Sequence, residues 1–202
     1  MASTSLFKAD LNNYLRELNH SLERCLVTDQ FEQPIPVDEA VARSLELLHR
    51  VRAQDGKAMI VGNGGSAAIA SHMQNDLCKC DGMRAMVFSE TPLLTAWTND
   101  VGYEVAYERQ LLLWAEPRDI LIAISSSGQS QNIVRTATTA QQEGVPVITL
   151  SGFSPKNTLR QIGDLNFFVP SMSYGMVELS HSILCHFLTD SFASPTLECI
   201  PC

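Results

Sequence analysis

The sequence is short of positive charge. It holds 14 Lys and Arg residues against 22 Asp and Glu residues, which gives a formal net charge of −8 at pH 7. Proteins that bind nucleic acid over a broad surface need clustered Lys and Arg, so this composition argues against a nucleic-acid partner. It leaves room for a small anion pocket, because the positive potential of such a pocket can be local.

Long apolar runs are also missing. No stretch approaches the ~20 apolar residues that span a bilayer, and residues 1–10 lack the basic end and the apolar core of a signal peptide. We therefore expect a soluble, cytoplasmic protein with no membrane partner.

The six cysteines do not follow the spacing of a zinc finger or of a disulfide scaffold. Cys78 and Cys80 form a C-x-C pair, but no second pair stands at zinc-finger spacing. Cys199 and Cys202 have C-x-x-C spacing, but they lie near the end of the chain and outside any βαβ pattern. A chain of 202 residues does not need disulfides to stabilise its core, so we expect reduced thiols.

Helix and strand patterns alternate along the chain. Periodicity predicts helices over residues 5–27, 37–52, 67–77, 93–97, 105–114, 132–142 and 176–187, and strands over 58–61, 83–88, 119–124, 145–150 and 164–169. Residues 28–36 contain two prolines and indicate a connection. Nearly all-apolar strands between helices are typical of a parallel sheet covered on both faces. With 45% apolar residues, we expect one α/β domain over 1–202, a doubly wound parallel sheet with an N-terminal helical extension over 1–52.

Two predicted strands run into loops with unusual chemistry. The first loop is Gly62-Asn-Gly-Gly-Ser66, and the second is Ser125-Ser-Ser-Gly-Gln-Ser130. Hydroxyls and backbone N–H groups before a helix N-terminus form a site for an anion, and phosphate is the natural guest. The alternative is that the serines only cap the helix, although one cap needs one hydroxyl. Neither loop matches a P-loop or G-x-G-x-x-G, which argues against ATP and NAD.

These two loops and the strand Val147-Ile-Thr-Leu-Ser-Gly152 resemble the sugar-isomerase (SIS) domain family, whose domain is a flavodoxin-like sandwich. Within it, the chain is most similar to the phosphoheptose isomerases, over nearly its whole length. The resemblance implies a cytoplasmic homotetramer that interconverts sedoheptulose 7-phosphate and D-glycero-D-manno-heptose 7-phosphate through an enediol, in lipopolysaccharide heptose biosynthesis. It implies a phosphorylated sugar bound by Asn63, Gly64, Gly65, Ser66, Asn99, Asp100, Ser125, Ser126, Ser127, Ser130 and Glu178.

The resemblance also implies four residues for catalysis or metal binding. Phosphoheptose isomerases carry His and Glu four residues apart after the glycine turn, and Gln and His eight apart on the last helix; some members bind zinc there. The matching residues are His72 and Asp76, and Glu178 and His186, so two of the four depart from the pattern. We expect Asp76 to act as base and His186 as its acid–base partner. His72 and Glu178 would orient them, or all four would hold zinc.

Three alternatives stay open at this stage. Gly-Ser-Ala-Ala-x-Ala-x-His also resembles the DnaA initiator-associating protein, a SIS tetramer without enzymatic activity, although that protein lacks the carboxylate at Asp76. The two departures also allow an isomerase of another phosphosugar. His181 is either a core residue or part of the site. The leucine stripe Leu11, Leu15, Leu18, Leu22 and Leu26 indicates a core or oligomer contact.

Overall fold

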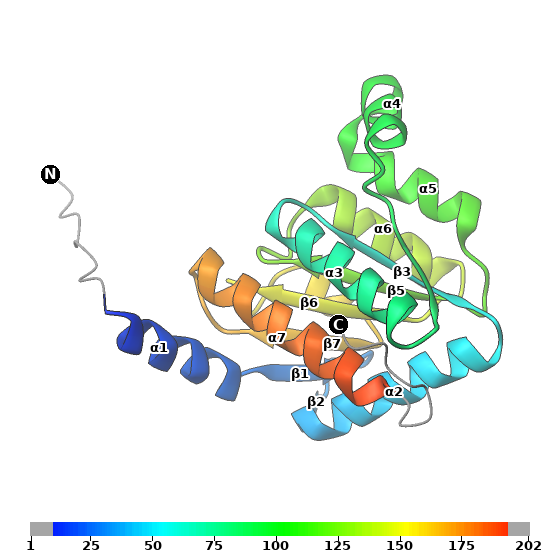
Figure 1. The fold of residues 1–202 in the computed structure, drawn as a ribbon. Coiled ribbons are helices and arrows are strands. Elements are labelled where there is room, and N and C mark those ends of the chain that lie inside the picture. Colours follow the sequence, from blue (N-terminus) through cyan, green and yellow to red (C-terminus); the bar gives the residue numbers. More distant parts are fainter. Residues whose placement is uncertain (1–9, 194–202) are drawn as a thin grey trace, which may run out of the picture.

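A seven-stranded sheet forms the centre of the computed structural model, which describes residues 10–193 (Figure 1). The strands are β1 (Leu26–Asp29), β2 (Pro34–Ile35), β3 (Lys57–Gly62), β4 (Arg84–Val87), β5 (Ile120–Ser125), β6 (Val147–Gly152) and β7 (Leu165–Val169). Their order across the sheet is β2-β1-β7-β6-β5-β3-β4. The five strands from β7 to β4 are parallel, which confirms the predicted α/β class.

Helices cover both faces of this sheet (Figure 1). They are α1 (Leu11–Glu23), α2 (Val37–Ala53), α3 (Gly65–Lys79), α4 (Thr91–Val101), α5 (Ala106–Trp114), α6 (Gln131–Gln142) and α7 (Tyr174–Phe192), with short 3₁₀ turns η1 (Tyr103–Val105) and η2 (Leu159–Gln161). Alternate residues of β5 divide between two cores. Ile120, Ile122 and Ile124 pack towards α2, α3 and α7, whereas Leu121 and Ala123 pack towards α5 and α6. This division explains why the strand is apolar at every position.

The N-terminal segment differs from the prediction. Residues 28–36 were expected to connect two helices, and Leu26 was expected in a helix. Instead α1 ends at Glu23, and β1 and β2 form an antiparallel hairpin that adds two strands to the sheet. Leu26 pairs with Phe168 of β7. The hairpin depends on a strand about 140 residues away in sequence, which no local pattern reveals. Residues 5–9 of the predicted helix lie outside the described residues, as do Cys199 and Cys202.

The chain reverses its direction of winding between β3 and β5. From β3 it moves outward to β4, and then crosses back through α4 and α5 to β5 on the other side of β3. Adjacent loops that leave such strands in opposite directions open a crevice at the carboxyl ends of the strands, where ligands bind in open α/β sheets. The glycine turn follows β3 and the serine loop follows β5, so both meet at this crevice.

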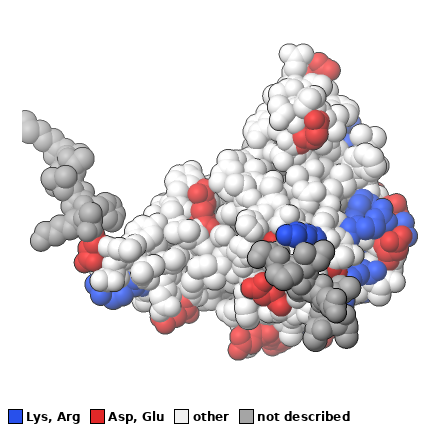
Figure 2. Space-filling model, viewed as in Figure 1, with Lys and Arg blue, Asp and Glu red and all other residues white. Residues whose placement is uncertain are grey.

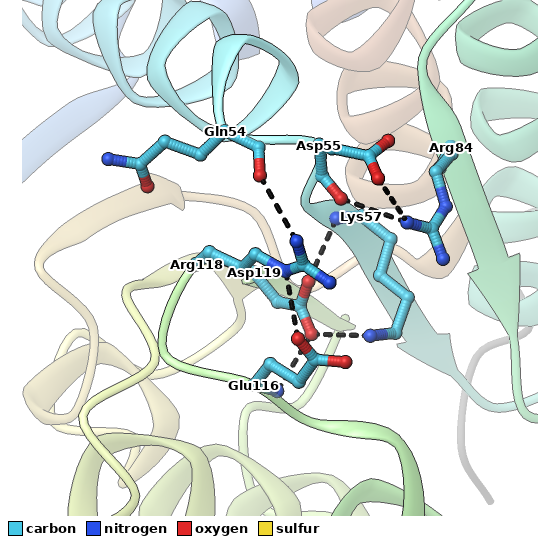
Figure 3. Close-up of polar contacts among 7 residues, drawn as sticks. All are labelled: Gln54, Asp55, Lys57, Arg84, Glu116, Arg118 and Asp119. Carbon is cyan, nitrogen blue, oxygen red and sulfur yellow. Dashed lines mark hydrogen bonds and ion pairs between the residues drawn. The ribbon is translucent and has the colours of Figure 1, made fainter.

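The opposite, amino-terminal ends of β3 and β5 are fixed by a polar network (Figure 3). The buried Asp119 carboxylate accepts hydrogen bonds from the Lys57 backbone N–H at 2.9 Å, the Lys57 Nζ at 2.6 Å and the Glu116 N–H at 2.8 Å. Arg118 donates to Glu116, and Arg84 pairs with Asp55. Every charge in this group has an opposite charge beside it, so the network locks the register of the two strands that carry the loops.

On the face seen in Figure 2, charged side chains of both signs lie over α1, and further basic side chains gather on the right, next to acidic ones. Among the described residues, no helix is long and apolar enough to cross a membrane.

Burial raises the pKa of Cys25 to about 11 and, together with the nearby Asp76 charge, that of Cys185 to about 12. Both thiols are therefore protonated at neutral pH.

Candidate functional site

The glycine turn, the serine loop and the start of α7 enclose a cavity of about 260 Å³ at the crevice between β3 and β5. All the predicted substrate-binding residues line it except Asn99 and Asp100. Its lining is formed by Asn63, Gly64, Gly65, Ser66, Ser125, Ser126, Ser127, Ser130, Tyr174 and Glu178. Residues from three separate parts of the sequence thus meet in one pocket.

Three helices begin at this pocket, and none has a side-chain cap. The N-cap residues of α3, α6 and α7 are Gly64, Ser130 and Ser173, and no side chain at these positions accepts a helix N–H. The serines of the loop therefore do not serve merely to cap α6. Helix N-termini carry partial positive charge and N–H groups without partners, so they favour an anion at their end of the pocket, although none of its lining residues is Lys or Arg.

The serine loop contains hydrogen bonds between its own residues. The N–H of Gly128 donates to Ser125 Oγ at 3.2 Å, and the N–H of Gln129 donates to Ser127 Oγ at 3.2 Å. The Oγ of Ser126 is buried and has no hydrogen-bond partner in the described protein. A buried hydroxyl without a partner is costly unless a ligand or water bonds to it. This hydroxyl is consistent with a phosphate that binds in the loop.

The glycine turn lies close against the first residues of α7. Gly64 has φ +55°, a conformation that glycine adopts without strain. At Gly65, a Cβ atom would lie 2.5 Å from both carboxylate oxygens of Glu178. The Glu178 carboxylate therefore lies directly over the first residue of α3, where the helix dipole favours a negative charge.

Asn63 joins the glycine turn to the serine side of the pocket. Its Nδ2 donates to Asn132 Oδ1 at 2.9 Å, and its Oδ1 accepts from Asn132 Nδ2 at 2.9 Å, so the two amides form a reciprocal pair. The Tyr103 hydroxyl also donates to Asn63 Oδ1, at 2.7 Å. The Asn63 oxygen thus has two donors already, and this residue fixes the shape of the pocket. Asn132 and Tyr103 were not predicted, because no local pattern shows which side chains meet Asn63.

Asn99 and Asp100 lie apart from the pocket lining. Both are exposed near the end of α4, where Asn99 Nδ2 donates to Asp100 Oδ1 at 2.8 Å. Helix α4 stands out from the body of the chain (Figure 1). The hydroxyl of Tyr103, which follows α4, links this region to Asn63 in the pocket.

A second group of side chains joins α3 to α7. His72 Nε2 lies 3.7 Å from Asp76 Oδ1, and His186 Nδ1 lies 3.4 Å from Asp76 Oδ2. The two imidazole rings are 4.6 Å apart, edge to face. One ligand atom from each of the three residues lies within 4.8 Å of the others. Two imidazoles and a carboxylate are ligands that suit zinc, so the donor set and its spacing fit such an ion.

The two groups lie along the same pair of helices. Helices α3 and α7 are in contact, and both begin at the pocket (Figure 1). Glu178 and His186 are separated by two turns, roughly 12 Å along the axis. Glu178 therefore belongs to the pocket, and it is not part of the His72–Asp76–His186 group among the described residues. The arrangement suits a substrate with an anion at one end and a reacting centre further along.

His181 is a core residue. It is fully buried, and its Nε2 contacts the Ser151 carbonyl oxygen at 3.1 Å. Burial lowers the pKa of its imidazole to about 4, and the Ser151 contact opposes this shift only in part.

Tyr174, in contrast, lines the pocket and was missed by the sequence analysis. The signal for it was its spacing, since Tyr174 stands four residues before Glu178 and hence on the same helix face.

Known proteins resemble this chain in sequence and in structure. Residues 13–152 match the SIS domain. A phosphoheptose isomerase from Thiobacillus denitrificans is 33% identical over 162 residues, which cover 76% of this chain and 82% of that protein. One from Bordetella avium is 32% identical over 185 residues, with coverage of 87% and 92%. The structure of a phosphoheptose isomerase from Neisseria gonorrhoeae matches with a TM-score of 0.77 and 25% identity, over 90% of this chain and 97% of that one. The chain therefore belongs to the SIS domain family and, within it, to the phosphoheptose isomerases.

Proposed function

We propose that this protein is an aldose–ketose isomerase that interconverts sedoheptulose 7-phosphate and D-glycero-D-manno-heptose 7-phosphate. The observation that carries the proposal is the pairing of two groups on α3 and α7. An anion pocket lies where the helices begin, and two imidazoles around a carboxylate lie further along. The phosphate would bind in the serine loop, and the carbon chain would extend towards His72, Asp76 and His186.

The reaction moves a proton between C1 and C2 through an enediol, while a second proton moves between the two oxygens. A carboxylate can accept the carbon-bound proton, and an imidazole can exchange protons with the oxygens. We assign Asp76 as the base and His186 as its partner, because Asp76 Oδ2 lies 3.4 Å from His186 Nδ1. His72 contacts the other carboxylate oxygen, so it would orient Asp76 between the two rings.

Zinc is the cofactor that this group would hold, with His72, Asp76 and His186 as its ligands. A bound cation supplies Lewis-acid polarisation of the substrate carbonyl. Glu178 would join this set only after its side chain leaves Gly65, so we assign it to the sugar instead. With Asp76 as ligand, one of its oxygens would remain for the substrate proton.

We further propose that the protein works as a homotetramer in the cytoplasm, in the supply of heptose for lipopolysaccharide. Residues 1–52 would contribute the helical contacts of this assembly. Active sites at subunit boundaries would bring Asn99 and Asp100 to the substrate, since α4 projects away from its own subunit (Figure 1). The alternative, a regulator without catalytic activity, is not favoured, because Asp76 stands between both imidazoles and the relatives that match are isomerases.

The test is isomerisation of sedoheptulose 7-phosphate in deuterated water, with and without a chelator and added zinc. We expect the aldose product to carry deuterium at C2. Asp76→Asn and His186→Gln should each lower turnover by about 10² to 10⁴, while phosphosugar binding persists because the serine loop is intact. Asp190→Asn removes an exposed carboxylate of α7 and should leave turnover unchanged.

Asp76→Glu adds the methylene that the family residue has. It should raise the rate if the shorter side chain limits contact with the sugar carbon. Wild-type protein that neither forms product nor exchanges a C1 proton of sedoheptulose 7-phosphate, with or without zinc, would overturn the enzymatic function and favour the regulator.

A further inference from the structure

Tyr174 has a distinctive place in the phosphosugar pocket. It is the first residue of α7, one turn before Glu178, and among the described residues that line the pocket it is the only aromatic side chain. The side chain is 62% exposed in the subunit. Its ring is therefore accessible to a ligand.

Phe153 holds this ring from behind. The two ring centroids are 4.8 Å apart, and the planes meet at 84°, an edge-to-face contact that aromatic pairs favour. Phe153 follows β6 directly and has φ +59°, which is unfavourable for a bulky side chain. Its N–H donates to the Ser171 carbonyl at 3.0 Å, and its ring packs against the core. These contacts hold Phe153 in a strained backbone conformation in which its ring packs against Tyr174. Strained residues of this kind are common at functional sites.

The pocket has two chemically different sides. The serine loop and the uncapped helix ends suit the phosphate, whereas Tyr174 and Glu178 offer an aromatic ring and a carboxylate on one helix face. A sugar chain fits that second side, because its C–H groups can lie on the ring while its hydroxyls donate to the carboxylate. Tyr174 is twelve residues from His186, roughly 18 Å along the helix, so its contact falls near the phosphate end of the substrate.

We propose that Tyr174, positioned by Phe153, is a specificity-determining residue that binds the part of the sugar chain next to the phosphate. The inference rests on the proposed function, since it assumes a phosphosugar substrate. Tyr174 would distinguish a sugar phosphate from inorganic phosphate through carbons far from the reacting bond. The residue would act on substrate affinity more than on proton transfer.

The experiment measures the binding of sedoheptulose 7-phosphate, fructose 6-phosphate and inorganic phosphate to the full chain by calorimetry. Tyr174→Ala should weaken sedoheptulose 7-phosphate binding about tenfold, the loss of one aromatic contact, and should leave inorganic phosphate binding within about twofold. Tyr174→Phe should retain most of the affinity. Phe153→Gly should show an intermediate loss, because it relieves the positive φ but releases the ring. Met172→Ala is the matched control, since Met172 is 75% exposed and does not line the pocket.

Equal binding of sedoheptulose 7-phosphate by the wild type and Tyr174→Ala would overturn the inference. So would an equal loss of affinity for all three ligands, which would mean that the variant damages the whole pocket. Wild-type protein that binds inorganic phosphate but neither sugar phosphate would instead contradict the proposed function, and this inference with it.

Discussion

At the scale of single residues, His181 and Asp81 are ionisable side chains that are buried with polar atoms lacking a partner. Burial lowers the pKa of His181 from 6.5 to about 4. Between these values the unfolded chain binds a proton at His181 that the folded chain does not. The free energy of unfolding therefore falls as pH drops from about 6.5 to 4.

Asp81 acts in the opposite direction. Burial raises the pKa of its carboxyl from 3.8 to about 6; the Arg52 guanidinium opposes this shift, and the Asp76 and Asp190 carboxylates add to it. In this range the folded chain binds the proton more tightly than the unfolded chain. The free energy of unfolding therefore falls as pH rises from about 4 to 6, and the Asp81 charge remains a cost at neutral pH.

Asp81→Asn should for this reason stabilise the protein at pH 7.5, by about 1–2 kcal/mol, because it removes a buried charge without a hydrogen-bond partner. The gain should shrink towards pH 5, because the Asp81 carboxyl of the wild type is then largely protonated in the folded state. In the variant only the His181 effect remains, so its free energy of unfolding should fall more steeply on acidification than that of the wild type. Urea unfolding at both pH values measures this. Asp190→Asn, which removes an exposed carboxylate nearby, is the control. An equal gain at the two pH values would contradict the explanation.

At the scale of elements, the site depends on two loops that must keep a fixed distance. The Asn63–Asn132 amide pair joins the glycine turn after β3 to the first turn of α6 after the serine loop. Asn132 is buried, and its Oδ1 also accepts the Ile133 N–H at 3.0 Å. This contact across the crevice holds the glycine turn against the serine loop.

Asn132→Asp should break one of the two bonds of that link, and it places a negative charge beside the phosphate pocket while keeping the helix. A carboxylate cannot donate to Asn63 Oδ1, but it is favourable in the first turn of α6. We expect kcat/KM for sedoheptulose 7-phosphate to fall about 10- to 100-fold, mainly through KM, which corresponds to roughly 1.4–2.7 kcal/mol. Tyr103→Phe removes one of the bonds to Asn63 and should cost only severalfold. Unchanged kinetics in Asn132→Asp, with the protein folded, would show that the pair does not position the loops.

The central elements could be predicted from the sequence, because their signals are local. Apolar runs mark β3, β5 and β6, and the residue types of the glycine turn and the serine loop are enough to indicate an anion site. The β1–β2 hairpin was missed because Pro34 and Pro36 indicate a connection, whereas its strands form only through pairing with β7. Phe153, Tyr103 and Asn132 were missed for the same reason: their roles come from tertiary contacts that leave no pattern in the neighbouring residues.

At the scale of the whole molecule, helix α1 contributes no residue to the hydrophobic core. None of its residues is buried, and Leu11 and Leu15 are 71% and 50% exposed. The helix extends from the body beside α7 (Figure 1), whose Leu179, Ile183 and Phe187 also expose apolar surface. Apolar surface of this extent is unusual in a monomer and typical of a subunit interface.

We therefore expect a homotetramer in which these helices pack against other copies of the chain. Light scattering at micromolar concentration should give four times the subunit mass, and Leu11→Glu with Leu15→Glu should lower it, because buried charges without partners oppose association. Asn12→Glu adds one such charge at an exposed position next to Leu11 and should leave the assembly intact. If Asn99 and Asp100 act in a neighbouring subunit, the dissociated double variant should also lose isomerase activity while it still binds inorganic phosphate. A wild-type chain that is monomeric at this concentration would contradict the assembly, and a monomeric variant with full activity would confine the active site to one subunit.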